Sequence, residues 1–168
     1  LVNLRCSACS AIYPADQLIN LCTCGKPLMA MYDLAGVRET LSPDILKERS
    51  HSMWRYRELL PARGLHQIIS LGEGCTPLLD AKSVANNLGL AKVWVKDEGC
   101  NPTGSFKARG LSVAVTMAKL LGAKKLGIPS AGNAGGALAA YAAGAGLEAN
   151  VFMPQDVPIT NRIECEAM

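Results

Sequence analysis

The sequence predicts an α/β fold with a mostly parallel sheet, preceded by a small cysteine-rich segment. Two observations support this prediction. From Gly72 onward, short β-type runs alternate with longer helical stretches, a pattern typical of βαβ units. Four of the seven cysteines lie within the first 24 of the 168 positions. With 49% hydrophobic and 18% charged residues, the chain can bury a core and does not have the composition of a disordered protein.

We divide the chain into a zinc-ribbon-like segment, residues 1–34, and an α/β domain, residues 35–168. The first part of that domain, residues 35–71, is predicted to be helical. Ser42 can cap a helix that has Pro43 in its first turn. Apolar and aromatic side chains then recur near helical spacing from Met53 until Pro61 ends the pattern.

Beyond Gly72 we expect strands over residues 93–95, 126–128 and 151–153. Helices are expected over residues 106–121, 134–145 and 159–168. The chain stops just inside the last of these helices. The series of strands and helices is therefore unfinished, and we expect the chain to be a fragment of a longer protein.

Charge and hydropathy exclude two classes of partner. The net charge of +3 is too small and too scattered for a nucleic-acid surface. Residues 126–147 carry no charge, but Pro129, Asn133 and several glycines interrupt them and large apolar side chains are few, so we expect no membrane span. The first residues contain no apolar signal core, which favours the cytoplasm.

The cysteine pairs Cys6-x-x-Cys9 and Cys22-x-Cys24 approximate a four-thiolate zinc site on two tight turns. The second pair is one residue tighter than the usual C-x-x-C. A metal-free ribbon and thiol redox chemistry are the alternatives. Because few basic and aromatic residues surround the cysteines, a ribbon here would be structural or a contact surface, with no role in binding nucleic acid.

A turn at Asn101-Pro102-Thr103-Gly104 leads through Ser105 and Phe106 to Lys107. Gly99 and Gly104 are spaced as in a Walker A loop, but the lysine comes two positions too late for that motif. Ser105 can cap a helix that begins near Lys107. The helix dipole there disfavours a positive charge and favours the neutral amine that Schiff-base chemistry needs. The alternative is an ordinary solvated lysine on a helix face.

The segment from Ser130 to Gly136 follows a strand and opens a helix. Its small side chains and free backbone amides suit a carboxylate or phosphate, and Asn133 adds a side-chain donor. It does not match the dinucleotide fingerprint G-x-G-x-x-G, because Ala134 occupies the second glycine position. The alternative is that the glycines serve only close packing of helix on sheet.

Together the lysine and asparagine motifs resemble those of the pyridoxal-phosphate enzymes of the tryptophan-synthase-β type, most of all the threonine synthases. The segment from Gly72 to Leu78 resembles that family's E-G-x-T-P-L sequence. Trp54-Arg55-Tyr56 is similar to part of its N-terminal helix. Some members also begin with a cysteine-paired ribbon.

The resemblance implies a three-layer αβα fold with a mostly parallel sheet. It implies that Lys107 binds pyridoxal 5'-phosphate covalently and acts as general base, and that Asn133 binds the cofactor's 3′ oxygen. Ser130, Gly132 and Ala134 would bind the carboxylate of a small-molecule amino-acid substrate. The reaction would convert O-phosphohomoserine and water to threonine and phosphate. A homodimer is expected, and zinc is a possible second cofactor at Cys6, Cys9, Cys22 and Cys24.

Two departures from the family pattern leave alternatives open. Ala108 follows the lysine where threonine synthases often have aspartate. The family's glycine-rich loop for the cofactor phosphate comes later than Met153, and the residues after it do not supply one. We therefore expect the chain alone not to complete an active site. The alternatives are a threonine or serine dehydratase, a cysteate-synthase-like enzyme, and a non-catalytic truncated module.

Overall fold

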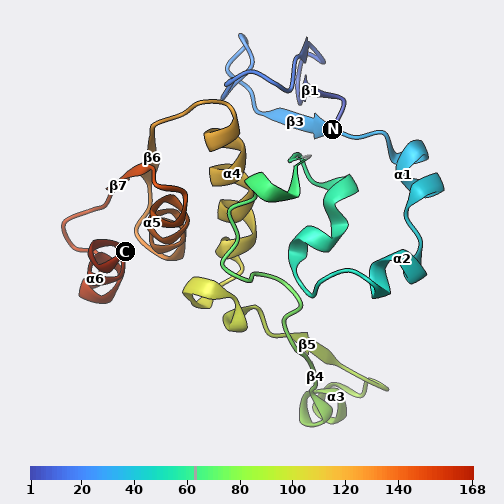
Figure 1. Ribbon diagram of the computed structural model, residues 1–168. Helices are drawn as coiled ribbons and strands as arrows, with labels where there is room; N and C mark the ends of the chain where they lie inside the picture. The colour runs from blue at the N-terminus through green and yellow to red at the C-terminus, as the bar shows by residue number, and fades with distance from the viewer. Residues whose placement is uncertain (63) are drawn as a thin grey trace.

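The structure is a computed structural model that describes residues 1–62 and 64–168. Figure 1 shows three parts arranged along helix α4 (Lys107–Leu120). A small N-terminal sheet lies at one end, a mainly helical body surrounds α4, and a short strand–helix–strand unit projects beyond the other end.

The N-terminal sheet has β1 (Asn3–Cys6) in its centre, between β2 (Ile12–Tyr13) and β3 (Leu28–Met31). Both neighbours run antiparallel to β1. Before β3 the chain reverses in a tight turn at Gly25, whose φ of +76° favours glycine.

Short helices follow the sheet: α1 (Leu34–Thr40), α2 (Pro43–Lys47), and the 3₁₀ helices η1 (Met53–Leu59) and η2 (Leu65–Gln67). The predicted cap is confirmed, because Ser42 Oγ accepts a hydrogen bond from Ile45 N at 3.3 Å. The helical segment after Met53 is a 3₁₀ helix with a kink at Tyr56, so its spacing does not produce a regular α-helix.

The projecting unit consists of β4 (Leu78–Asp80), α3 (Lys82–Leu88) and β5 (Trp94–Lys96). Its strands pair antiparallel, and every residue in them is exposed. The described residues form three small sheets, of which only β6–β7 is parallel, and the strand predicted over residues 93–95 pairs with β4. Because both faces of β5 are exposed, the sequence pattern identifies the strand but not its partner.

The body contains β6 (Lys125–Pro129), α5 (Asn133–Ala145), β7 (Glu148–Phe152) and α6 (Ile159–Ala167). Strands β6 and β7 pair in parallel with α5 as their crossover, which confirms the predicted βαβ unit. Helix α5 packs against α4, β7 and α6. The buried core between α4 and α5 is formed by Ala108, Val115, Leu138, Tyr141 and Ala145.

The uncharged alanine-rich stretch is thus explained by burial inside the protein. Nine of the thirteen residues of α5 are buried, and small side chains allow neighbouring elements to approach it on several sides. None of the helices in the described part of the chain has both the length and the hydrophobicity of a membrane span.

Candidate functional site

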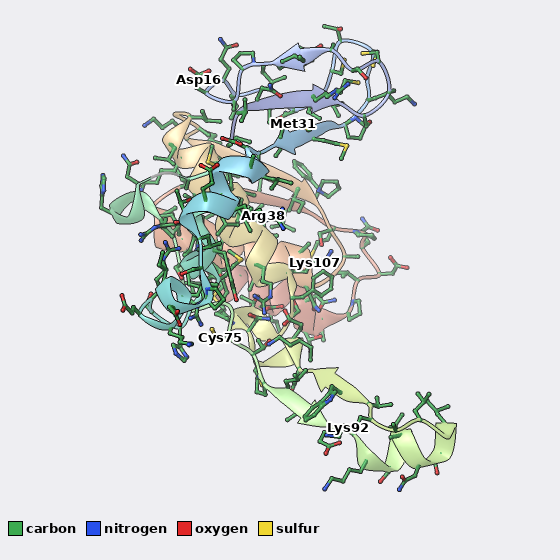
Figure 2. All side chains as sticks on the ribbon, turned by 90° about the vertical axis from the view of Figure 1, so that its right-hand side faces the viewer. Asp16, Met31, Arg38, Cys75, Lys92 and Lys107 are labelled. Atoms are coloured by element: carbon green, nitrogen blue, oxygen red, sulfur yellow. The ribbon has the colours of Figure 1, made fainter. Side chains whose placement is uncertain are left out.

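Lys107 is the first residue of α4, as predicted, and lies in the middle part of the molecule (Figure 2). The N-cap position belongs to Phe106, which corrects the expected Ser105 cap. Ser105 Oγ nevertheless accepts a hydrogen bond from Lys107 N at 3.3 Å. Lys107 Nζ lies 4.8 Å from the centre of the Phe106 ring, and no ion pair among the described residues includes it.

The loop before Lys107 contains the 3₁₀ helices η3 (Glu98–Cys100) and η4 (Pro102–Gly104). Thr103 has a φ of +59°, which is unusual for a β-branched residue. Its hydroxyl oxygen is buried and has no hydrogen-bond partner among the described residues. A buried polar atom without a partner fits a loop that receives a polar ligand. The sequence pattern predicts only a turn at Thr103 and no role in ligand binding.

Glu98 organises this loop, although no sequence motif marks it as a functional residue. Arg109 of α4 binds both of its carboxylate oxygens, at 2.6 and 2.7 Å. Thr76 Oγ1 donates to Glu98 at 2.6 Å, and Asn101 Nδ2 donates at 2.9 Å. These contacts, with the Arg109 guanidinium first among them, lower the pKa of Glu98 to about 2. The first turn of α4 is thereby fixed to the preceding loop.

The Glu98–Arg109 pair predicts an acid-dependent loss of stability. The pKa of Glu98 is lower in the folded chain, so its contribution is complete above the ordinary carboxyl value of about 4.3 and is lost as pH falls toward about 2. We expect Glu98→Gln to cost about 1–2 kcal/mol near pH 7, allowing for partial exposure, and to flatten that acid dependence. Urea denaturation at several pH values measures both.

Glu148→Gln is the matched control for this substitution, because Glu148 pairs with Lys125 at an exposed surface position. Its loss is expected to be much smaller than that of Glu98→Gln, because solvent and salt screen an exposed ion pair. Equal losses for the two substitutions, or an unchanged acid slope in Glu98→Gln, would contradict the assignment.

The turn from Ser130 leads into α5, with Gly132 at the N-cap position. Ser130 Oγ accepts hydrogen bonds from the amides of Gly132 and Gly135, at 3.3 and 3.1 Å. Some of the amides expected to be free are therefore already bound. Those of Asn133 and Ala134 have no acceptor within the described part of the chain, and they remain available to an anion at this helix N-terminus.

Some glycines of this segment serve close packing of the helix on the sheet, which was the alternative to ligand binding. A Cβ atom at Gly135 would lie 2.8 Å from Val151 Cγ1, so a larger residue here would displace Val151 where α5 meets β7. The exposed Asn133, by contrast, is available to a ligand. The glycines after Asn133 serve packing, while the residues up to Ala134 form the accessible turn.

The loop that precedes Lys107 contacts the helix that the second motif opens. The 3₁₀ helix η4 of the lysine loop contacts α5, which begins at Asn133. Gly74 of the third motif joins them, because its amide donates to Asn101 Oδ1 at 3.1 Å. The lysine loop therefore contacts both the Gly74 segment and helix α5.

Beneath these segments lies a completely buried carboxylate, that of Glu73. It accepts hydrogen bonds from Trp54 Nε1 at 2.8 Å, Ser112 Oγ at 2.6 Å, Tyr141 OH at 2.5 Å and Leu71 N at 3.0 Å. Burial by itself raises the pKa of Glu73, but these hydrogen bonds outweigh it and the pKa lies below its ordinary value. Glu73 thus connects η1, α4 and α5 as an anion.

The four N-terminal cysteines form a separate cluster. Cys6 Sγ lies 3.5 Å from Cys24 Sγ, and Cys9 Sγ lies 3.5 Å from Cys22 Sγ. All four sulfur atoms are within 4.8 Å of one another. Backbone hydrogen bonds lower the pKa of Cys6, and the Tyr13 hydroxyl lowers that of Cys22 to about 6.

Comparisons with known proteins identify relatives that match most of this chain, including the segments around Glu73, Lys107 and Asn133. A threonine synthase from Methanocaldococcus jannaschii is 41% identical over 151 residues, which cover 90% of this chain and 37% of the relative. A threonine synthase from Methanosarcina acetivorans is 38% identical over 155 residues, 92% of this chain and 37% of the relative. One from Synechocystis is 42% identical over 116 residues, 66% of this chain and 30% of the relative. The chain therefore spans about a third of the length of these relatives.

The family described as "Pyridoxal-phosphate dependent enzyme" matches residues 69–168. This range contains Glu73, Lys107 and Asn133, and it is more than half of the chain. The chain belongs to the family of pyridoxal-phosphate dependent enzymes.

Proposed function

We propose that this chain is the N-terminal part of a pyridoxal-phosphate dependent threonine synthase, which converts O-phosphohomoserine and water to threonine and phosphate. The contact between η4 and α5 carries the assignment to the cofactor, because it joins the lysine loop to the helix that begins at Asn133. The relatives named threonine synthase support the choice of reaction.

In this proposal Lys107 would hold the cofactor covalently through Nζ, and once the substrate's amine has displaced it, the freed Nζ would carry a proton to or from the substrate carbon. Asn133 donates its side-chain amide to the 3′ oxygen of the cofactor. Gly132 and Ala134 accommodate the substrate carboxylate at the N-terminus of α5, and Ser130 holds that turn in place. Pyridoxal phosphate, when bound, withdraws electrons from the substrate.

We assign residues 35–168 to the N-terminal part of a three-layer αβα catalytic domain. The parallel pair β6–β7 with its crossover α5 supports this fold. A homodimer is proposed for the complete enzyme. We propose the cytoplasm as its location, since a reducing compartment keeps clustered thiols such as these free.

Covalent labelling tests the role of Lys107. The chain is incubated with pyridoxal phosphate, and borohydride then adds hydride to any carbon–nitrogen double bond and fixes the adduct as a secondary amine. Peptide mass spectrometry is expected to find the adduct at Lys107. Lys96 and Lys119 are internal controls, because Lys96 Nζ donates to Thr76 O and Lys119 Nζ donates to Ala145 O.

Lys107→Arg should abolish this adduct, whereas Lys119→Arg should leave it unchanged. Adducts scattered over every exposed lysine, or none at all, would overturn the assignment for this chain. The substrate is tested on the complete protein. Phosphate release from O-phosphohomoserine supports the synthase, and ammonia release from threonine would replace it with a dehydratase.

A further inference from the structure

The N-terminal sheet lacks the hydrophobic core that a folded unit needs. Within residues 1–34, all of which the structure describes, only Cys6 and Cys22 are buried. The strands contain four, two and four residues. A segment this small is not stable from apolar burial alone, and proteins of this size usually depend on disulfides or a metal ion.

The cysteine sulfur atoms have the spacing of metal ligands. Zinc bound by four thiolates at about 2.3 Å gives a tetrahedron with sulfur–sulfur edges of roughly 3.8 Å. The two distances of 3.5 Å, and the limit of 4.8 Å for all pairs, agree with such a tetrahedron. A disulfide needs a sulfur–sulfur distance of about 2.0 Å, and disulfides would form separate pairs of cysteines and would not bring four sulfur atoms together.

The surrounding groups support bound thiolates. The amides of Ala8 and Cys9 donate to Cys6 Sγ at 3.4 and 3.5 Å. The Tyr13 hydroxyl lies 3.1 Å from Cys22 Sγ. Hydrogen bonds of this kind orient ligands and stabilise their negative charge at metal sites.

We propose that Cys6, Cys9, Cys22 and Cys24 bind one zinc ion, which takes the place of a hydrophobic core in residues 1–34. The ion joins the end of β1 to the turn that precedes β3. The four thiolates leave no coordination position for water or substrate, so the ion is structural and takes no part in catalysis.

Metal content is the first test. The full chain, purified under reducing conditions and dialysed against metal-free buffer, is expected to retain one zinc ion. Cys9→Ser and Cys24→Ser should weaken zinc binding by more than about 100-fold. Mutating a residue that only hydrogen-bonds to a metal ligand already lowers metal affinity about 10–100-fold, so loss of a ligand itself should cost more. Both positions are exposed, so the exposed Cys100 supplies a matched control, and Cys100→Ser should retain the ion.

A spectroscopic test needs no variant. Cobalt(II) added to the metal-free chain should give thiolate-to-cobalt charge-transfer absorption and the intense visible bands of a tetrahedral site, and zinc should abolish both. A chain that binds neither metal while all seven thiols react freely would overturn the proposal. Retention of zinc by both Cys9→Ser and Cys24→Ser would do the same.

The structural role has its own readout. Removal of zinc from the full chain should accelerate amide hydrogen exchange in β1 and β3, while α4 and α5 keep their protection. Unchanged exchange in β1 and β3 after zinc removal would overturn the structural role. Because pyridoxal-phosphate labelling at Lys107 is measured separately, failure of the zinc proposal and failure of the proposed enzyme are distinguishable.

Discussion

Glu73→Ala is expected to lower the free energy of unfolding by about 3–5 kcal/mol, because it removes a completely buried acceptor and leaves Tyr141 OH and Leu71 N without a partner. Trp54 Nε1, Ser112 Oγ and Tyr141 OH all donate to this carboxylate in the folded chain. Each belongs to a different helix, so the substitution loosens η1, α4 and α5 together. Urea denaturation followed by circular dichroism measures the loss.

Two further variants test whether the loss comes from the buried hydrogen bonds of Glu73 or from the removal of any glutamate. Glu39→Ala removes an exposed glutamate and should change stability by less than about 0.5 kcal/mol. Tyr141→Phe removes one donor and should cost about 1–2 kcal/mol. If Glu73→Ala were no more damaging than Glu39→Ala, the carboxylate would not connect the helices.

The hydrogen-bond partners of Glu73 could not be predicted from the sequence. The motif around Glu73 was recognised by its resemblance to a family, but its donors are 19, 39 and 68 positions away along the chain. No local periodicity reports that a tryptophan, a serine and a tyrosine share one carboxylate. Glu98 was missed for the same reason, because its role depends on Arg109 and Thr76 reaching it through the fold.

The βαβ unit was predictable because its signals are local. Apolar strands flank a stretch of small residues that begins at Asn133 and ends at Gly146, where φ is +68° and the helix closes in a left-handed turn. Lys107 at the start of α4 was predictable from the preceding turn in the same way. The partner of β5 was not, because neither face of that strand is buried.

Gly74→Ala is expected to cost about 3–4 kcal/mol, from two causes that the chain allows us to separate. Gly74 has a φ of +105°, a conformation that strains an alanine, and an added Cβ would lie 2.4 Å from the backbone nitrogen of Met53. That nitrogen donates to Glu73 O at 2.9 Å, so the segment before η1 cannot move away without losing this contact. Equilibrium denaturation measures the cost.

Gly72 and Gly110 are the matched controls for Gly74. Gly72 has a φ of +97° but open space around it, so Gly72→Ala adds only backbone strain, about 1–2 kcal/mol. Gly110 lies inside α4 with open space and no positive φ, so Gly110→Ala should stabilise the chain by about 0.5–1 kcal/mol. The difference between Gly74→Ala and Gly72→Ala therefore measures the close approach to Met53. Equal losses at the two positions would show that the backbone near Met53 yields at no cost, and that strain alone requires glycine at position 74.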